Sequence, residues 1–229
     1  MKKIIVIVLF IITFLTLLIV SIDVTLNKDT KLAIKLNSIN LDDIDNLMVV
    51  AHPDDETLWG GVHLLSDNYL VVCVTCVDKE RIEEFKNVMK ASSNEYIILG
   101  YPDKTNNQRD NWNTSYDGIK LDLEEIVDYK KWNTIVTHNP DGEYGHIHHM
   151  LVSEIMTNIS PKDRLYYFNK YYTKEDIEIG DKSLKRITNN ELMQKEELLK
   201  LYPSQGNIIN NHRQTIIYER FIPYNEWYK

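Results

Sequence analysis

The chain has 229 residues, of which 43% are hydrophobic and 26% are charged, the composition of an ordinary globular protein with room for one sizeable domain. Its 26 basic and 34 acidic residues give a formal net charge of −8. This acidic balance argues against binding to nucleic acid, which requires a basic surface, and it fits a neutral substrate or an anionic one held only locally.

The N-terminus begins with a long apolar stretch. Residues 4–20 carry no charge, and their only polar members are two threonines. As a helix they would span roughly 26 Å, close to the hydrocarbon core of a bilayer. We therefore interpret residues 1–22 as an uncleaved transmembrane anchor, with a signal peptide as the alternative. Lysines flank both ends, and the short basic head favours an extracytoplasmic domain over one on the cytosolic face.

A predicted polar tether at residues 23–45 precedes a predicted folded domain at residues 46–229. Within this domain, apolar β-rich runs alternate with segments of helical spacing. The predicted strands are 46–51, 69–76, 95–100, 132–140 and 164–168. The predicted helices are 57–67, 79–92, 119–130, 148–159 and 188–203, the last opening with a capping box at Thr188 and Glu191.

Alternating strands and helices predict an α/β domain, in which a mostly parallel sheet carries helices on both faces. Such sheets bind ligands beyond the carboxyl ends of their strands. Two polar segments stand at such ends: "HPDDE" (52–56) follows the first strand, and "HNPDGEYGHIHH" (138–149) follows a later one. The two segments are therefore expected at the same edge of the sheet.

These two segments offer the residue types that hold a catalytic metal ion. His52 and Asp55 lie three residues apart around a proline, and His146 and His149 lie three apart at a predicted helix start. Two imidazoles and one carboxylate with a fourth position open are typical of catalytic zinc, which makes hydroxide available near neutral pH. Alone, either motif is also typical of a charged helix N-terminus or a surface histidine pair. Together they predict a metal hydrolase.

At this point the sequence resembles a known family. "AHPDDE", "RIEE", "LGYPD", "THNPDGEYGHIHH" and "KLYPSQ" are similar to the motifs of the LmbE/PIG-L family of zinc-dependent N-acetylglucosaminyl de-N-acetylases. The resemblance spans residues 46–205 and implies a Rossmann-like three-layer domain. It also implies zinc as cofactor, with iron or cobalt as alternatives in the cell, and an N-acetylated amino sugar as substrate.

The resemblance implies a role for each residue of the two main motifs. His52, Asp55 and His149 match the metal ligands. Asp54 matches the general base, which deprotonates the attacking water and returns the proton to the leaving amine. His146 matches the imidazolium that stabilises the oxyanion.

Further residues are expected to support the site. Arg81 and Asp103 match positions that contact substrate, whereas Glu56 is expected to support the turn. Three aromatic residues could face a sugar ring, although core packing is the favoured interpretation for each: Trp59, Tyr144 and Tyr202.

The chain departs from the family at one place. The usual second motif reads G-H-P-D-H, whereas this chain has Gly145-His146-Ile147-His148-His149. His148 therefore replaces an acid and is an alternative metal ligand to His149. His138 is expected to support the ligands or to pack in the core.

We therefore predict a membrane-anchored zinc deacetylase. It would hydrolyse the N-acetyl group of an N-acetylglucosamine-type amino sugar, carried by a glycolipid, a glycoconjugate or a polysaccharide, to a free amine and acetate. The alternatives are another amide hydrolase on the same scaffold, a non-catalytic sugar-binding domain, and a tethered adhesion or scaffold domain. Oligomeric state is not predicted.

Overall fold

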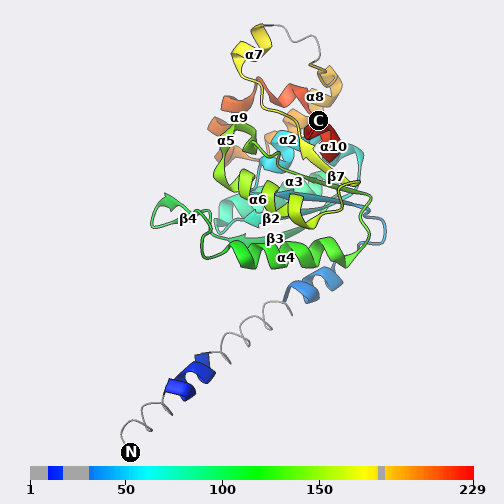
Figure 1. Ribbon diagram of the computed structural model, residues 1–229. Helices are drawn as coiled ribbons and strands as arrows, with labels where there is room; N and C mark the ends of the chain where they lie inside the picture. The colour runs from blue at the N-terminus through cyan, green and yellow to red at the C-terminus, as the bar shows by residue number, and fades with distance from the viewer. Residues whose placement is uncertain (1–9, 18–30, 180–183) are drawn as a thin grey trace, which may run out of the picture. The chain divides into compact units, whose positions relative to one another are not determined.

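The computed structural model describes residues 10–17, 31–179 and 184–229 (Figure 1). The chain falls into two compact units, Met1–Asn40 and Leu41–Lys229. Residues 10–17 and 31–38 of the first unit are helical. Most of the predicted anchor and part of the tether lie outside the described residues. Within the described ranges, no helix is both long and apolar enough to cross a membrane.

The second unit is built on a six-stranded sheet in the order β3-β2-β1-β6-β7-β8. The strands are β1 (Asn46–Val50), β2 (Tyr69–Thr75), β3 (Glu95–Tyr101), β6 (Thr134–Thr137), β7 (Leu165–Phe168) and β8 (Phe221–Pro223). All neighbours are parallel except β8, which pairs antiparallel with β7 at the edge. The five predicted strands and the parallel sheet are confirmed; the three-residue β8 was too short to predict.

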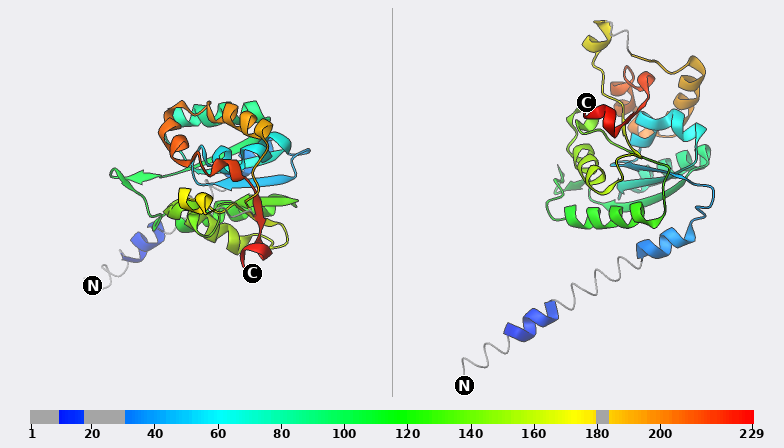
Figure 2. Two further views of the ribbon diagram at one scale, coloured as in Figure 1. Left: turned by 90° about the horizontal axis from the view of Figure 1, so that it is seen from above. Right: turned by 45° about the vertical axis from the view of Figure 1, so that its right-hand side comes forward.

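Helices cover both faces of this sheet (Figure 2). One face carries α2 (Asp55–Ser66), α3 (Lys79–Ser92) and α8 (Asn189–Leu199), and the other carries α4 (Tyr116–Tyr129) and α6 (Ile147–Ile159). All five were predicted. The shorter elements were not: β4 (Lys104–Thr105), β5 (Gln108–Arg109), α5 (Gly142–Gly145), α7 (Lys174–Glu178), η1 (Pro203–Gln205), α9 (Gly206–His212), η2 (Ile216–Tyr218) and α10 (Tyr224–Trp227).

Local sequence explains why the main elements form. Every residue of β2 is buried, and its continuous apolar run is typical of a central parallel strand. Helix α3 buries Phe85, Val88 and Met89, which share one face at helical spacing. Helix α8 begins with the predicted capping box, in which Thr188 and Glu191 each accept a hydrogen bond from the other's backbone N–H.

The chain order of the strands shows where the sheet has a crevice that can bind a ligand. Strand β1 pairs with β2 on one side and with β6 on the other, so the winding direction reverses between β1 and β6. Val49 and Thr137 are paired in register, so the two strands end side by side. Ligands bind at such a reversal in open α/β sheets, and both polar segments leave the sheet there.

A buried ion pair links α8 to the C-terminal part of the chain. Lys195 and Glu219 have fully buried side chains, and Nζ lies 2.7 Å from Oε2. Lys195 also donates to the carbonyl oxygens of Leu58 and Ile216. Nδ1 of His63 lies 2.7 Å from Oε1 of Glu219. These hydrogen bonds offset the cost of burying the two charges.

We expect Glu219→Gln to lower the free energy of unfolding at pH 7 by about 3–5 kcal/mol, because Lys195 loses its buried counter-ion. Burial raises the pKa of Glu219, but the charges of Lys195 and His63 hold it below its usual value. Its stabilisation is therefore present above the ordinary glutamate pKa of about 4.3 and is lost as pH falls below that value. Urea unfolding should show a smaller difference between variant and wild type at pH 3.

A matched control is the exposed pair of Lys200 and Glu197, whose side chains are 67% and 65% accessible. Solvent screens this pair, so Glu197→Gln should change stability little. An equal loss of unfolding free energy in Glu219→Gln and Glu197→Gln would show that burial does not determine the strength of the ion pair.

Candidate active site

The turn after β1 presents two side chains to the crevice. The backbone N–H of His52 donates to Oδ2 of Asp55 at 2.8 Å, and Nδ1 of His52 lies 3.2 Å from the same oxygen. Both residues are buried. The turn therefore aims the imidazole of His52 and the carboxylate of Asp55 at one point, as the sequence predicts.

Helix α6 brings His149 to the same point. Nε2 of His149 lies 3.3 Å from Oδ1 of Asp55, and Nδ1 lies 2.5 Å from Oε2 of Glu143. A carboxylate can only accept, so Nδ1 carries a proton, and Nε2 is the nitrogen left to face Asp55. Nε2 is buried and has no hydrogen-bond partner among the described residues. A ring nitrogen that faces a carboxylate inside the protein calls for a positive charge between them, which a metal ion or a proton on Nε2 supplies.

Three groups of side chains in the described part of the chain bring possible ligand atoms within 4.8 Å of one another: His52, Asp55 and His149; His52, His146 and His148; and His138, Glu143 and His149. His138 is not available as a ligand. Its Nε2 accepts from the N–H of Ala51 at 2.9 Å, and its Nδ1 lies 2.9 Å from Glu143. His138 therefore supports the site, as predicted. Without His138 the third group lacks a full set of ligands, whereas the first group keeps Asp55 opposite the buried Nε2 of His149.

The charges of the first group also favour a cation. Burial lowers the pKa of His149, but the carboxylates of Asp55 and Glu143 raise it to about 10. Burial raises the pKa of Asp55, yet His149 and His138 hold it well below its usual value. Two imidazoles and a carboxylate, with Glu143 orienting one imidazole, fit a divalent metal ion.

Asp54 lies beside these ligands in a strained conformation. Its φ of 108° is unusual for a residue with a side chain, and such strain persists where the surrounding structure fixes it. Its N–H donates to Oε2 of Glu56 at 3.1 Å, and its Oδ2 lies 3.5 Å from Nη2 of Arg81. Burial raises the pKa of Asp54 well above its usual value, Asp55 raises it further, and Arg81 opposes this. A carboxyl group with a raised pKa, a property suited to proton transfer, therefore stands next to the candidate metal ligands.

Glu56 supports the turn, as predicted. Its carboxylate accepts from the hydroxyls of Thr57 at 2.6 Å and Tyr202 at 2.7 Å, in addition to the N–H of Asp54. Burial raises the pKa of Glu56 to about 7, against the hydrogen bonds from Thr57 and Tyr202 that lower it. Tyr202 is thus a structural residue here, in agreement with the core packing favoured for it over a place at a sugar ring.

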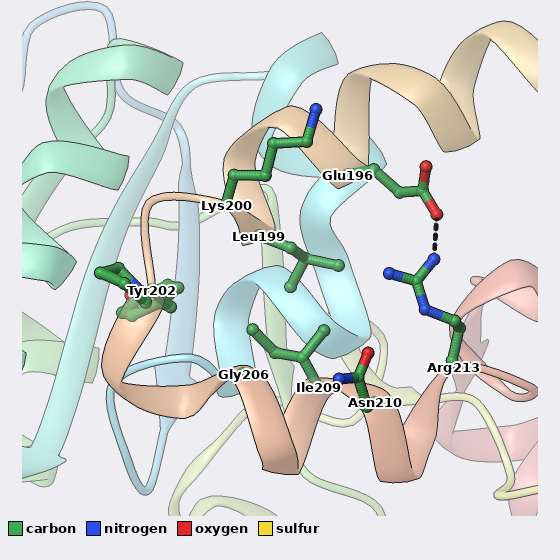
Figure 3. Close-up of a pocket in the computed structure, with 9 residues that line it drawn as sticks. Glu196, Leu199, Lys200, Tyr202, Gly206, Ile209, Asn210 and Arg213 are labelled. Atoms are coloured by element: carbon green, nitrogen blue, oxygen red, sulfur yellow. Dashed lines mark hydrogen bonds and ion pairs between the residues drawn. The ribbon is translucent and has the colours of Figure 1, made fainter.

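Tyr202 also lines a separate cavity of about 210 Å³ between α8, η1 and α9 (Figure 3). Leu199 and Ile209 line this cavity too, and the ion pair of Glu196 and Arg213 stands beside them. None of the predicted catalytic or metal-binding residues lines it. The reactive groups gather elsewhere.

The cavity at the crevice has a volume of about 90 Å³. Its lining residues are His52, Asp54, Asp55, Leu58, Arg81, Asp103, Arg109, Tyr144, His146, Gln205 and Ile208. Of the three aromatic candidates for a sugar ring, only Tyr144 is among them. Trp59 is buried and packs beside Tyr171 and His212.

The two predicted substrate contacts have partners of their own. Arg81 donates to the carbonyl oxygen of Pro53 at 2.6 Å in addition to pairing with Asp54. Oδ1 of Asp103 lies 3.1 Å from Nη1 of Arg109. Arg109 stands at the end of β5 and belongs to no recognisable motif, so the sequence did not point to it.

His146 and His148 occupy different surroundings. His146 lines the cavity and is the N-cap of α6, with Nδ1 accepting from the N–H of His148 at 3.2 Å. Burial, together with the charges of His149 and His52, lowers the pKa of His146 to about 2. His148 is fully buried, and its ring stacks on Trp112 at 4.1 Å.

A family model and a relative match this chain. The family model of PIG-L, described as GlcNAc-PI de-N-acetylase, matches residues 47–160. An uncharacterized protein of Acanthamoeba polyphaga mimivirus is 30% identical over 190 residues, which cover 75% of this chain and 76% of the relative.

Two solved structures share the fold. One is GalB, the 4-carboxy-2-hydroxymuconate hydratase of Pseudomonas putida, with a TM-score of 0.52 and 12% identity, covering 75% of this chain and 84% of that one. The other is the N,N'-diacetylchitobiose deacetylase of Pyrococcus horikoshii, with a TM-score of 0.50 and 13% identity, covering 82% and 87%. At these identities the likeness concerns the fold alone.

Proposed function

Because the chain belongs to the PIG-L family of de-N-acetylase-type hydrolases, we propose that it removes the acetyl group from an N-acetylglucosamine-type amino sugar. The sugar would be carried by a glycolipid, a glycoconjugate or a polysaccharide, and the products are acetate and a free amine. One observation carries the proposal: the buried Nε2 of His149 faces Asp55 without a hydrogen-bond partner among the described residues, and His52 and Asp54 lie beside them. This arrangement combines a cation site with a proton acceptor.

Zinc is the proposed ion, with iron or cobalt as alternatives in the cell. Nδ1 of His52, the carboxylate of Asp55 and Nε2 of His149 would hold it. Such an ion polarises an amide carbonyl and lowers the pKa of a water molecule to about 7. The protein itself positions the substrate and moves the protons.

Asp54 is the proposed general base. It accepts a proton from the attacking water as the new C–O bond forms at the acetyl carbon. It then delivers that proton to the sugar nitrogen as the C–N bond breaks, so the elements of water are divided between acetate and amine. The hydrogen bond from its N–H to Glu56 and the pairing with Arg81 keep its carboxylate in place.

His146 is the proposed donor to the oxyanion. Its lowered pKa favours the neutral imidazole over the imidazolium that the family resemblance implies. Because Nδ1 of the neutral ring accepts from the N–H of His148, the proton resides on Nε2. Nε2–H can therefore stabilise the oxyanion as a neutral hydrogen-bond donor.

The remaining lining residues are proposed to hold the substrate. Arg81, Arg109 and Asp103 offer charged and polar contacts to hydroxyl groups or to an anionic substituent. Tyr144, which is 44% exposed, offers a ring face to the sugar.

We further propose that residues 1–22 anchor the enzyme in a membrane, with the catalytic domain on the extracytoplasmic side. The uncharged composition of residues 4–20 supports the anchor. Protease accessibility in intact cells tests the orientation: the domain should be digested without lysis. Protection until lysis would contradict the extracytoplasmic placement.

The function is tested by measuring acetate release from a panel of N-acetylglucosamine conjugates by the zinc-loaded full-length protein. Turnover of at least one amino-sugar conjugate is expected. Turnover of simple acyl amides alone would favour another amide hydrolase. Sugar binding without acetate release would favour the non-catalytic alternative.

A further inference from the structure

We propose that His148 is a positioning residue that holds the ligand His52 in its metal-binding tautomer, rather than a metal ligand itself. The inference rests on the proposed function, because it concerns the same metal site. It arises from the departure of this chain from the family motif, in which an acid usually stands at this position.

The hydrogen bonds of His148 fix where its proton resides. Its Nε2 lies 2.6 Å from the carbonyl oxygen of Asp110, which can only accept. Nε2 of His148 therefore carries the proton, and Nδ1 of the neutral ring has a bare lone pair.

This lone pair determines the tautomer of His52. Nδ1 of His148 lies 3.0 Å from Nε2 of His52, and two bare nitrogens at that distance would repel each other. The proton of His52 therefore resides on Nε2 and is donated to His148. Nδ1 of His52 faces Oδ2 of Asp55 at 3.2 Å and is the nitrogen left for a metal ion, which would take the place of any proton shared with that carboxylate.

His148 is itself firmly placed. Its ring lies parallel to the indole of Trp112, with 4.1 Å between centroids and 2° between planes. Trp112 is fixed in turn, because its Nε1 donates to the carbonyl oxygen of Pro102 at 2.8 Å and its N–H donates to Asp110 at 2.7 Å. The segment after β5 thus clamps His148 from one side, while α6 carries it from the other.

His148 is a better partner for His52 than its nearest rival. Oδ1 of Asp103 lies 3.5 Å from Nε2 of His52, further than His148, and this oxygen also accepts from Arg109. Both nitrogens of His148 are used, by His52 and Asp110, whereas Nε2 of His149 faces Asp55 and makes no hydrogen bond to any residue that the structure describes. The ligand role thus belongs to His149 and the positioning role to His148.

The test compares His148→Phe, His148→Asn and Asp103→Asn with wild type in the full-length protein. Phenylalanine keeps a ring against Trp112 but removes the acceptor. Asparagine restores an acceptor, because its Oδ1 stands as many bonds from Cα as Nδ1 of histidine does. Zinc affinity is measured by competition with a chelator, and the tautomer of His52 by ¹⁵N NMR of the metal-free protein.

His148→Phe should weaken zinc binding by about 10–100-fold, a loss typical of removing a partner of a metal ligand. His148→Asn should recover most of this loss, and wild type should carry a proton on Nε2 of His52. Unchanged affinity in His148→Phe, or a larger loss in Asp103→Asn, would overturn the positioning role. A wild-type protein that binds no zinc would instead overturn the proposed metal site, and this inference with it.

Discussion

Asp54→Asn is expected to lower kcat for acetate release by about 10²–10⁴-fold, the contribution typical of general acid–base catalysis. The amide cannot accept a proton from water or return one to the leaving amine. Asparagine tolerates the positive φ of 108° at this position, so the turn should keep its shape. The measurement is steady-state kinetics on the zinc-loaded variant, with bound zinc quantified in the same sample.

The control for this variant is Asp128→Asn, which makes the same chemical change at an exposed position in α4. It should leave kcat near the wild-type value. If Asp54→Asn binds zinc and retains wild-type turnover, Asp54 is not the base.

His149→Ala is expected to weaken zinc binding by more than about 100-fold, because one of three protein ligands is lost. A graded series sharpens this result. Glu143→Gln leaves the ligand in place but removes the carboxylate at 2.5 Å from its Nδ1, so a loss of about 10–100-fold is expected. Chelator competition measures both variants against Asp128→Asn as control.

The order of the series identifies the ligand. A loss in His149→Ala that exceeds the loss in Glu143→Gln is expected. If His149→Ala binds zinc as tightly as wild type, His149 is not a metal ligand, and another histidine of the site takes that role.

The sheet and its five main helices could be predicted because their residues follow simple periods. The buried run of β2 and the apolar face of α3 are such patterns. The convergence of His52, Asp55 and His149 was also predictable, since parallel strands end at one edge and both motifs stand at strand ends. A residue's position in the fold can therefore be predicted where it depends on spacing along the chain.

Other parts of the site depend on contacts that spacing does not determine. Trp112 reaches His148 across 36 positions of chain from a segment without a motif, and its φ of 58° has no sequence signature. Glu143, with a φ of 57°, contacts both His138 and His149 because of that backbone conformation. Tyr202 carries a polar tip that could face a sugar or a buried carboxylate, and only packing shows that it meets Glu56.

The central claim is that one metal ion at His52, Asp55 and His149 supports deacetylation. It is tested most directly by titrating zinc into the metal-free full-length protein while recording acetate release from an N-acetylglucosamine conjugate that it turns over. Activity should be absent without metal, rise with added zinc and level off at one ion per chain. Full activity in the metal-free protein, or no acetate release at full occupancy, would contradict the claim.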